Sequence, residues 1–212
     1  MIAPALNKGR AWLYGRCYLS MKDDVTYLNS IRIFIWLSVC LFASAAIMGY
    51  FAAAFDPEIA ANWTKELEML KWIMDLPPVL IMMIIFLKNL LACAMSILLG
   101  IGLGLVPLLV ATSNGFLLGI VSYGAIQKTG TLYLLAGILP HGIIELPVVL
   151  LSIALGFRLG YLLALSIAKD KADLTCETRR ATHILLSWIM PLLFVAAAIE
   201  TFITPIVISV VA

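Results

Sequence analysis

The chain alternates long runs of hydrophobic residues with short polar segments. The runs cover residues 31–55, 77–127, 131–168 and 182–211. A helix needs roughly 20 apolar residues to cross a hydrocarbon core about 30 Å thick, and each run is at least that long. Only helices and closed barrels satisfy their backbone hydrogen bonds inside a bilayer, so these runs predict membrane-spanning helices. The predicted fold is an all-α, polytopic membrane helix bundle.

The run at 77–127 is too long for a single crossing. It has 51 residues, and a helix of that length extends about 75 Å, more than twice the hydrocarbon thickness. The chain must therefore turn once within it. The turn is expected at residues 100–107, where three glycines and a proline weaken a helix. This run predicts two spans.

Charge predicts the orientation, because Lys and Arg concentrate on the cytoplasmic side of membrane proteins. The arm at 1–30 contains several basic residues and is placed inside, so the acidic, amphipathic segment 56–76 becomes an external loop. The basic segment 169–181, with Arg158 upstream, is placed in a cytoplasmic loop. The run at 131–168 then supplies one crossing. The prediction is about five spans in the inner (cytoplasmic) membrane, with the N-terminus in the cytoplasm and the C-terminus outside.

The chain is expected to consist of the arm at 1–30 and a single transmembrane domain at 31–212. Basic and aromatic residues in the arm are typical of a helix lying at the lipid headgroups, and equally of an ordinary cytoplasmic arm. Both interpretations stay open. The arm lacks the apolar core of a cleavable signal peptide, so the first span is expected to remain in the mature protein.

Composition supports the membrane class and excludes others. Hydrophobic residues make up 63% of the 212 residues and charged residues 12%, which is too little charge to cover a soluble domain of this size. The formal net charge of +2 does not suggest a nucleic-acid partner. Catalytic and nucleotide-binding motifs are absent from the sequence. The expected partner is membrane lipid, and no enzymatic activity is predicted.

The 38 residues of 131–168 exceed what one span needs. The surplus falls at 139–147, which reads Leu-Pro-His-Gly-Ile-Ile-Glu-Leu-Pro. Pro140, Gly142 and Pro147 all disfavour a regular helix. This segment is therefore predicted to be re-entrant or kinked.

His141 and Glu145 lie in this segment, four positions apart, and project from one face if it is helical. Irregular backbone at membrane depth survives only when it is buried in protein or faces a water-filled cavity. The segment is thus either a binding site of the kind transporters use or a hydrogen-bonded lock that stabilises a kink. Imidazole and carboxylate both ligate Zn²⁺, but two ligands are too few to identify a site. Neither a metal nor another cofactor is predicted.

Other polar side chains fall within the apolar runs. An unpaired charge at the centre of the bilayer costs about 2.5–3.5 kcal/mol on insertion scales, so these groups need partners. Lys88 either faces a cavity or extends its stem toward the interface. The remaining groups are expected to meet in one buried site between helices. This polar cluster consists of Asn89, Asn114, His141, Glu145 and Glu200.

Glycines spaced four apart recur along the chain. Such pairs let helices approach closely, either within one chain or between copies. Packing within the chain is the favoured interpretation, and a homo-oligomer is the alternative. The pairs are Gly100 with Gly104, Gly115 with Gly119, and Gly156 with Gly160.

The polar segments resemble the signature of the stage II sporulation protein M family. The run at 139–147, followed by Ala-Leu-Gly-Phe-Arg-Leu-Gly at 154–160, carries the resemblance most specifically. Phe-Leu-Lys-Asn at 86–89 and Ser-Asn-Gly-Phe-Leu-Leu-Gly at 113–119 are similar to its two Asn-bearing spans, and residues 198–205 to its C-terminal motif. The motif residues with a structural role are Gly115, Pro140, Gly142, Pro147, Arg158 and Pro205.

The resemblance implies a multi-pass membrane protein without hydrolase activity of its own. In spore formers, the member that gives the family its name recruits and anchors two proteins that remodel peptidoglycan during engulfment of the forespore. Members also occur in bacteria and archaea that never sporulate. The leading hypothesis is recruitment of envelope-remodelling partners. The alternative is a small channel or transporter for an ion or small solute, centred on the polar cluster.

Overall fold

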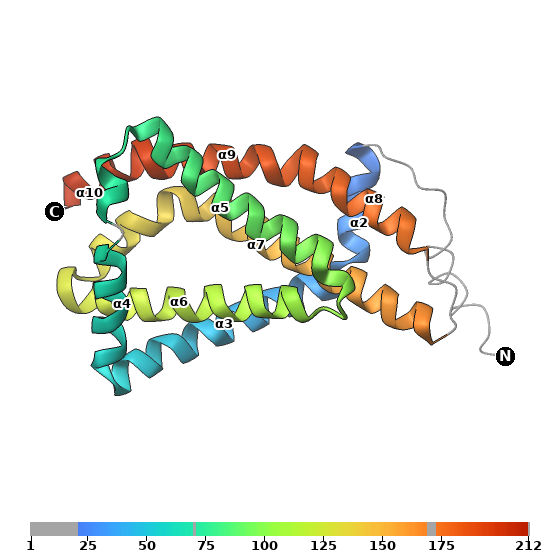
Figure 1. Ribbon diagram of the computed structural model, residues 1–212, viewed down its shortest axis with the longest axis horizontal. Helices are drawn as coiled ribbons and strands as arrows, with labels where there is room; N and C mark the ends of the chain where they lie inside the picture. Colours follow the sequence, from blue (N-terminus) through green and yellow to red (C-terminus); the bar gives the residue numbers. More distant parts are fainter. Residues whose placement is uncertain (1–20, 70, 169–172, 212) are drawn as a thin grey trace.

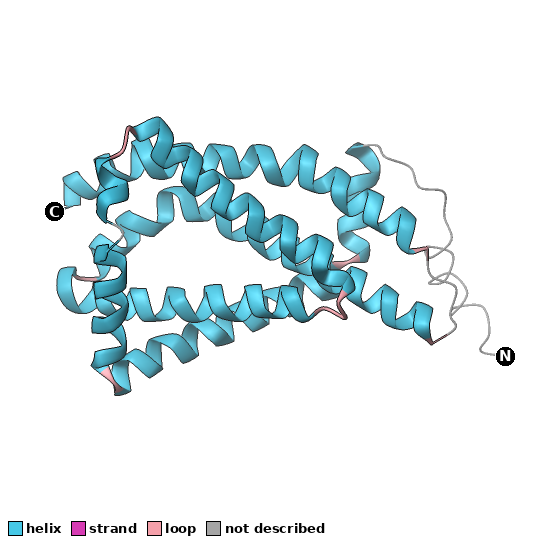
Figure 2. Ribbon diagram, viewed as in Figure 1, coloured by secondary structure: helices cyan, strands magenta, loops and turns pink. Residues whose placement is uncertain are grey.

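The computed structural model describes residues 21–69, 71–168 and 173–211. Almost all of these residues are helical, short loops join the helices, and none of them lies in a strand (Figure 2). The predicted interfacial arm at 1–30 lies partly outside the described residues, which begin with α2, Met21–Ser30. The all-α prediction is confirmed.

Five segments in the described chain are long and apolar enough to cross a membrane, as predicted. They are α3 (Arg32–Phe55), α5 (Pro78–Leu98) with the short 3₁₀ turn η3 (Leu99–Ile101), α6 (Leu105–Thr129), α7 (Thr131–Ile167), and a last segment, Leu174–Val211. The last segment consists of α8 (Leu174–Ile184), η4 (Leu185–Ile189), α9 (Met190–Ala198), η5 (Ile199–Ile203) and α10 (Thr204–Val211).

The turn predicted inside the second run lies where the glycines are. After η3 the backbone of Leu103 and Gly104 turns left-handed, with φ of 55° and 79°. Glycine adopts this conformation without the steric penalty that a side chain brings, so Gly104 can end one span and begin the next. Two antiparallel spans result, α5 and α6.

The segments predicted as loops are largely helical. Residues 56–76 contain α4 (Pro57–Met69) and the 3₁₀ helix η2 (Lys71–Asp75). The segment 169–181 is helical from Leu174 onward, because the side chain of Asp173 accepts a hydrogen bond from the backbone N–H of Cys176 at 3.0 Å and caps α8. Amphipathic sequence without an interior glycine or proline allows these helices.

α7 is one continuous helix of 37 residues despite Pro140 and Pro147. Figure 1 shows it bent, with a first part that runs in a different direction from its longer second part. Proline lacks the N–H of the helical ladder and its ring crowds the carbonyl four residues before it, so a bend is the expected consequence. Of the two predicted forms of 139–147, the structure has the kinked one.

Two π-helical turns interrupt the last segment, η4 and η5. In each, a backbone N–H bonds the carbonyl five residues back: Met190 to Leu185, and Thr204 to Ile199. Each turn comes just before a proline, Pro191 or Pro205. The wider turn is consistent with relief of the clash between a proline ring and the preceding turn.

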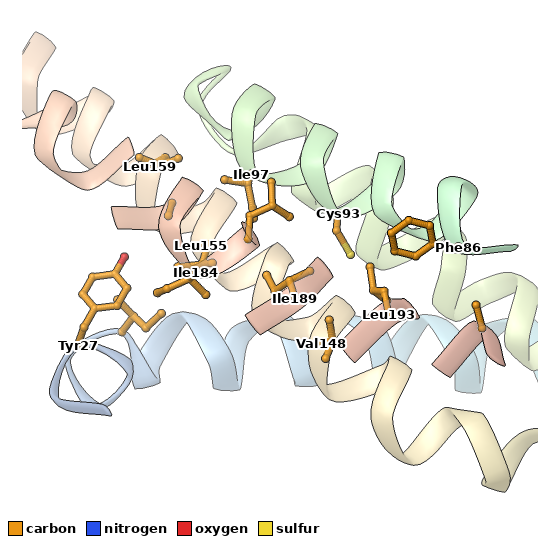
Figure 3. Packing of buried hydrophobic residues seen from close by; sticks show 14 of the residues in the cluster. Tyr27, Phe86, Cys93, Ile97, Val148, Leu155, Leu159, Ile184, Ile189 and Leu193 are labelled. Carbon is orange, nitrogen blue, oxygen red and sulfur yellow. The ribbon is translucent and has the colours of Figure 1, made fainter. Parts of the chain in front are cut away.

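The helices pack around one apolar core. Figure 3 shows its side chains from α5, α7 and the last segment pointing toward one another, among them Cys93, Leu155 and Leu193. Glycines give the closest approaches. A Cβ at Gly115 or Gly119 would meet the backbone carbonyl of α3. All three glycine pairs are therefore used in packing within the chain, which removes the support they gave to a homo-oligomer.

Charge is unevenly distributed between the two ends of the bundle. Figure 1 shows α4 running across one end, where α10 also ends, and α2 and the start of α8 at the other. The α4 end carries exposed acids together with Lys65 and Lys128, and the α2 end carries arginines together with Asp173 and Glu177. The exposed acids are Asp56, Glu58, Glu66 and Asp75; the arginines are Arg32, Arg158, Arg179 and Arg180.

Candidate functional site

Three titratable side chains meet near the middle of the bundle. His141 and Glu145 project from α7, and Glu200 comes from the π-helical turn η5. Their ligand atoms, one ring nitrogen and two carboxylate oxygens, all lie within 4.8 Å of one another, and each residue is half-buried. His141 is ten residues into α7, so about 15 Å of helix separates it from the start of this span.

Two prolines inside α7 and the π turn η5 flank these side chains. Pro140 precedes His141 directly, and Pro147 follows Glu145 by two residues. Glu200 lies inside η5 itself. π-helical turns are often found at functional sites, because they change the direction of side chains relative to a regular helix. Irregular helix from two elements therefore frames the three side chains.

Further polar groups surround the three. Asn89, on α5, lines the same cavity as Glu145. The hydroxyl of Thr204 donates to the carbonyl of Ile199 at 3.3 Å and lies 3.5 Å from Nδ1 of His141. Thr204 is 6% exposed, so its hydroxyl depends on these partners. Nothing in the sequence pattern pointed to Thr204, which lies 63 positions after His141 in the chain.

Lys88 brings positive charge to the same place. It interacts electrostatically with both Glu145 and Glu200. The side chain of Lys88 is exposed, and within the described residues it forms no ion pair with either carboxylate. An ammonium group near two carboxylates lowers the free-energy cost of holding those charges in an apolar environment.

Asn114 is placed less directly. It lies on α6 and donates through Nδ2 to the carbonyl of Val110, one turn back on its own helix, at 2.8 Å. Together with Asn89 and Glu145 it lines a cavity of about 230 Å³ between α3, α5, α6 and α7. Asn114 thus lines the same cavity as Glu145, while its amide N–H donates to the backbone of its own helix. The structure brings His141, Glu145, Glu200 and Asn89 together, and places Asn114 across a cavity from Glu145.

The motif residues singled out in the sequence differ in their surroundings, since the two glycines are buried whereas Pro147 and Pro205 are exposed. Gly115 and Gly142 are buried, the first against α3. Pro140 and Pro147 lie inside α7, and Pro205 follows η5. Arg158 lies far from the cluster, 13 residues beyond Glu145 on the same continuous helix, or about 20 Å away.

Arg158 instead belongs to a second polar junction at the α2 end of the bundle. Its Nε donates to Oε1 of Glu177, on α8, at 3.2 Å, and the hydroxyl of Tyr27, on α2, donates to the same oxygen at 2.6 Å. The guanidinium of Arg180 lies 4.7 Å from the centre of the Tyr27 ring. Burial of the phenol, and then the adjacent Glu177 carboxylate, raise the pKa of Tyr27 well above its ordinary value of 10.0.

The side chains of His141, Glu145 and Glu200 determine which chemistry this site can perform. One imidazole and two carboxylates can exchange protons, or can share a cation between them. A threonine hydroxyl is the nearest alcohol to His141, but its proton is donated to the Ile199 carbonyl, so the pair is not arranged as a nucleophile and its base. Ion or proton binding is the chemistry that this geometry favours.

Comparisons with known proteins find no matching curated protein and no matching solved structure. A family model, that of stage II sporulation protein M, matches residues 38–205. The match includes three of the spans in full, most of α3 and of the last segment, and every member of the polar cluster. This integral membrane chain belongs to the stage II sporulation protein M family.

Proposed function

We propose that this protein is a non-enzymatic membrane component that recruits or anchors partners which remodel the cell envelope. The observation that supports it most is membership of the stage II sporulation protein M family over residues 38–205. A recruiting protein needs a surface outside the bilayer that is held firmly by its membrane domain. In this chain the segment with those properties is α4 with η2.

α4 is attached to the bundle by one face. Ala60 on α4 is buried with Ala53 and Ile120, and Ile59 and Tyr123 pack around them. Its other face carries acids and an exposed Trp63, and Trp72 in η2 is 58% exposed. Tryptophan supplies large contact area and is enriched at protein interfaces and at membrane interfaces. The exposed face of α4 and η2 is therefore the proposed contact surface for a partner.

In-cell photo-crosslinking tests this surface. A photoreactive amino acid is placed at Trp63 or Trp72 in the full-length protein, and at Ile47 on α3 as the control, since Ile47 is also exposed but faces lipid. We expect peptidoglycan-remodelling proteins to crosslink from positions 63 and 72 and not from 47. Equal crosslinking from all three positions, or to lipid alone, would contradict the proposal. Purified protein should also release no fragments from isolated peptidoglycan.

We infer that the α2 end of the bundle faces the cytoplasm and that the protein lies in the inner membrane. The arginines at that end and the acids at the α4 end support this orientation through the positive-inside rule. Single cysteines at Asn62, on α4, and Thr175, on α8, test it in a background without native cysteines. A membrane-impermeant thiol reagent should label position 62 in intact cells and position 175 after lysis. The reverse pattern would mean that the orientation is inverted.

A second candidate function is passage of an ion or small solute through the bundle, and the His141, Glu145 and Glu200 group favours it. Charged groups within membrane-spanning segments commonly mark ion or proton pathways. Protein reconstituted in liposomes should then show flux that Glu145→Gln abolishes and that Glu66→Gln, at the exposed face of α4, leaves unchanged. Absence of flux for protons and for common mono- and divalent cations would leave recruitment as the function.

A further inference from the structure

We propose that His141, Glu145 and Glu200 bind a divalent transition-metal cation of the Zn²⁺ class within the membrane domain. The proposal does not depend on partner recruitment, because none of the three residues lies on α4 or η2. The sequence suggested two ligands four apart on one helix. The structure adds the third, because η5 carries Glu200 to the same point.

The spacing suits such an ion. Zn–N and Zn–O bonds are about 2.0–2.2 Å long, so two ligand atoms of a tetrahedral ion lie about 3.4 Å apart. The three ligand atoms here lie within 4.8 Å of one another. Rotation about the terminal torsions of the two glutamates is enough to close the difference, since these torsions are broad and soft. No change of the backbone is needed.

The donor set favours a transition metal over Mg²⁺ or Ca²⁺. Those two ions prefer six or more oxygen ligands, whereas an imidazole with carboxylates suits Zn²⁺ and its neighbours. Three protein ligands leave one tetrahedral position for water or another small ligand. The cavity of about 230 Å³ that Glu145 lines gives room beside this group.

Neighbouring groups orient the ligands as outer partners do in metal sites. Since the Thr204 hydroxyl gives its proton to Ile199, its oxygen is left to accept from Nδ1–H of His141. That tautomer leaves the lone pair of Nε2 for a metal. Asn89 lines the same cavity as Glu145 and gives the second ligand a polar neighbour. Two of the three ligands therefore have a polar neighbour.

Charge gives the ion an energetic reason to bind. Two carboxylates with one divalent cation form a neutral unit, which removes much of the penalty of ionised groups inside the membrane. Lys88 is the competing cation, since it interacts with both carboxylates. The proposal therefore predicts that removing a ligand weakens Zn²⁺ binding and that removing the Lys88 charge strengthens it.

Zinc binding to the full-length protein in detergent is the test, with Zn²⁺ itself as the probe and a chromophoric chelator as competitor. We expect one tightly bound Zn²⁺ per chain. His141→Ala, Glu145→Gln and Glu200→Gln should each weaken binding by at least about 100-fold, and Thr204→Val by roughly 10- to 100-fold, the range found for outer partners. Lys88→Met should tighten binding by about tenfold, because a repelling unit charge is lost.

Matched controls use the same chemistry elsewhere in the chain. His183→Ala changes the second of the two histidines, and Glu66→Gln changes an exposed acid on α4. Neither should alter the affinity. Binding of Co²⁺ to the wild-type protein supplies a readout that needs no variant to fold, since a nitrogen- and oxygen-ligated tetrahedral site gives visible absorption bands that Zn²⁺ removes.

Three results would overturn the proposal. The first is wild-type protein that binds no Zn²⁺ and shows no Co²⁺ bands. The second is binding that His183→Ala reduces as much as His141→Ala. The third is that Lys88→Met unfolds the zinc-free protein, because this is the behaviour of a polar lock neutralised by the lysine ammonium.

Discussion

The hydrogen bond from Tyr27 to Glu177 is expected to hold α2 against the membrane domain. The two residues are 150 positions apart, and their oxygens are 2.6 Å apart. Tyr27 is 3% exposed and the side chain of Glu177 12% exposed, so water competes little for this bond. Hydrogen bonds to charged groups contribute about 1.5–3 kcal/mol, more than exposed ion pairs do.

Tyr27→Phe removes the hydroxyl and keeps the ring, including its stacking with Arg180. We expect the free energy of unfolding to fall by about 1.5–3 kcal/mol, because Glu177 keeps Arg158 but loses its shorter bond. Unfolding by denaturing detergent in mixed micelles, followed by circular dichroism, measures the change. Tyr133→Phe on α7 is the matched control and should change stability by less than about 0.5 kcal/mol.

A double-mutant cycle isolates the bond from other effects. Glu177→Gln alone also leaves Arg158 without its carboxylate, so the single variant overstates the contribution of the Tyr27 bond. The coupling energy between Tyr27→Phe and Glu177→Gln should be at least about 1 kcal/mol. Additive effects, or a Tyr27→Phe variant as stable as wild type, would show that the hydroxyl contributes no net stability and would refute the reasoning.

Three further outcomes follow from the described geometry. Folding raises the pKa of the Tyr27 hydroxyl, so its contribution to the free energy of unfolding is full below about pH 10 and is lost as the pH rises toward the pKa of the folded protein. Unfolding measured in detergent at increasing alkaline pH should show this loss in the wild type and not in Tyr27→Phe. Gly119→Ala should destabilise by about 1–3 kcal/mol because its Cβ would overlap the α3 backbone, whereas Gly137→Ala, whose Cβ would make only an ordinary contact with Cδ1 of Ile208 at 3.9 Å, should be neutral or stabilising. Asp173→Ala should cost about 1 kcal/mol by removing the α8 cap, measured by the same unfolding assay.

The spans could be predicted from sequence because the bilayer sets their length. The first predicted run, 31–55, differs from α3 by one residue, and the turn expected at 100–107 contains the left-handed Gly104. Both predictions depend on local signals, namely apolar length and helix-breaking residues. Helix formation in 56–76 was not predicted, because amphipathic sequence between spans is compatible with either a loop or a surface helix.

The details of the polar cluster were harder to predict because they depend on registry between helices. The two ligands on α7 follow from helical spacing, but Glu200 reaches them through a π turn that sequence patterns do not reveal. One extra residue in a turn rotates the helix that follows by about 100°. A regular helix therefore gives the wrong face for residues after η5, and Thr204 was missed for this reason. The Tyr27 junction was missed because its members come from three separate elements.

The proposed recruiting surface and the proposed metal site are separable on the molecule. The exposed face of α4 carries Trp63, and α4 lies at one end of the bundle (Figure 1). His141 lies on another helix, α7, about 15 Å from the start of that helix. α6 contacts both regions, since Ile120 packs under α4 and Asn114 lines the cavity beside Glu145. Shared contact with a helix is not evidence of coupling. Variants at the metal ligands that lose zinc but keep normal crosslinking from α4 would show two independent properties, and each proposal can then be accepted or rejected on its own measurement.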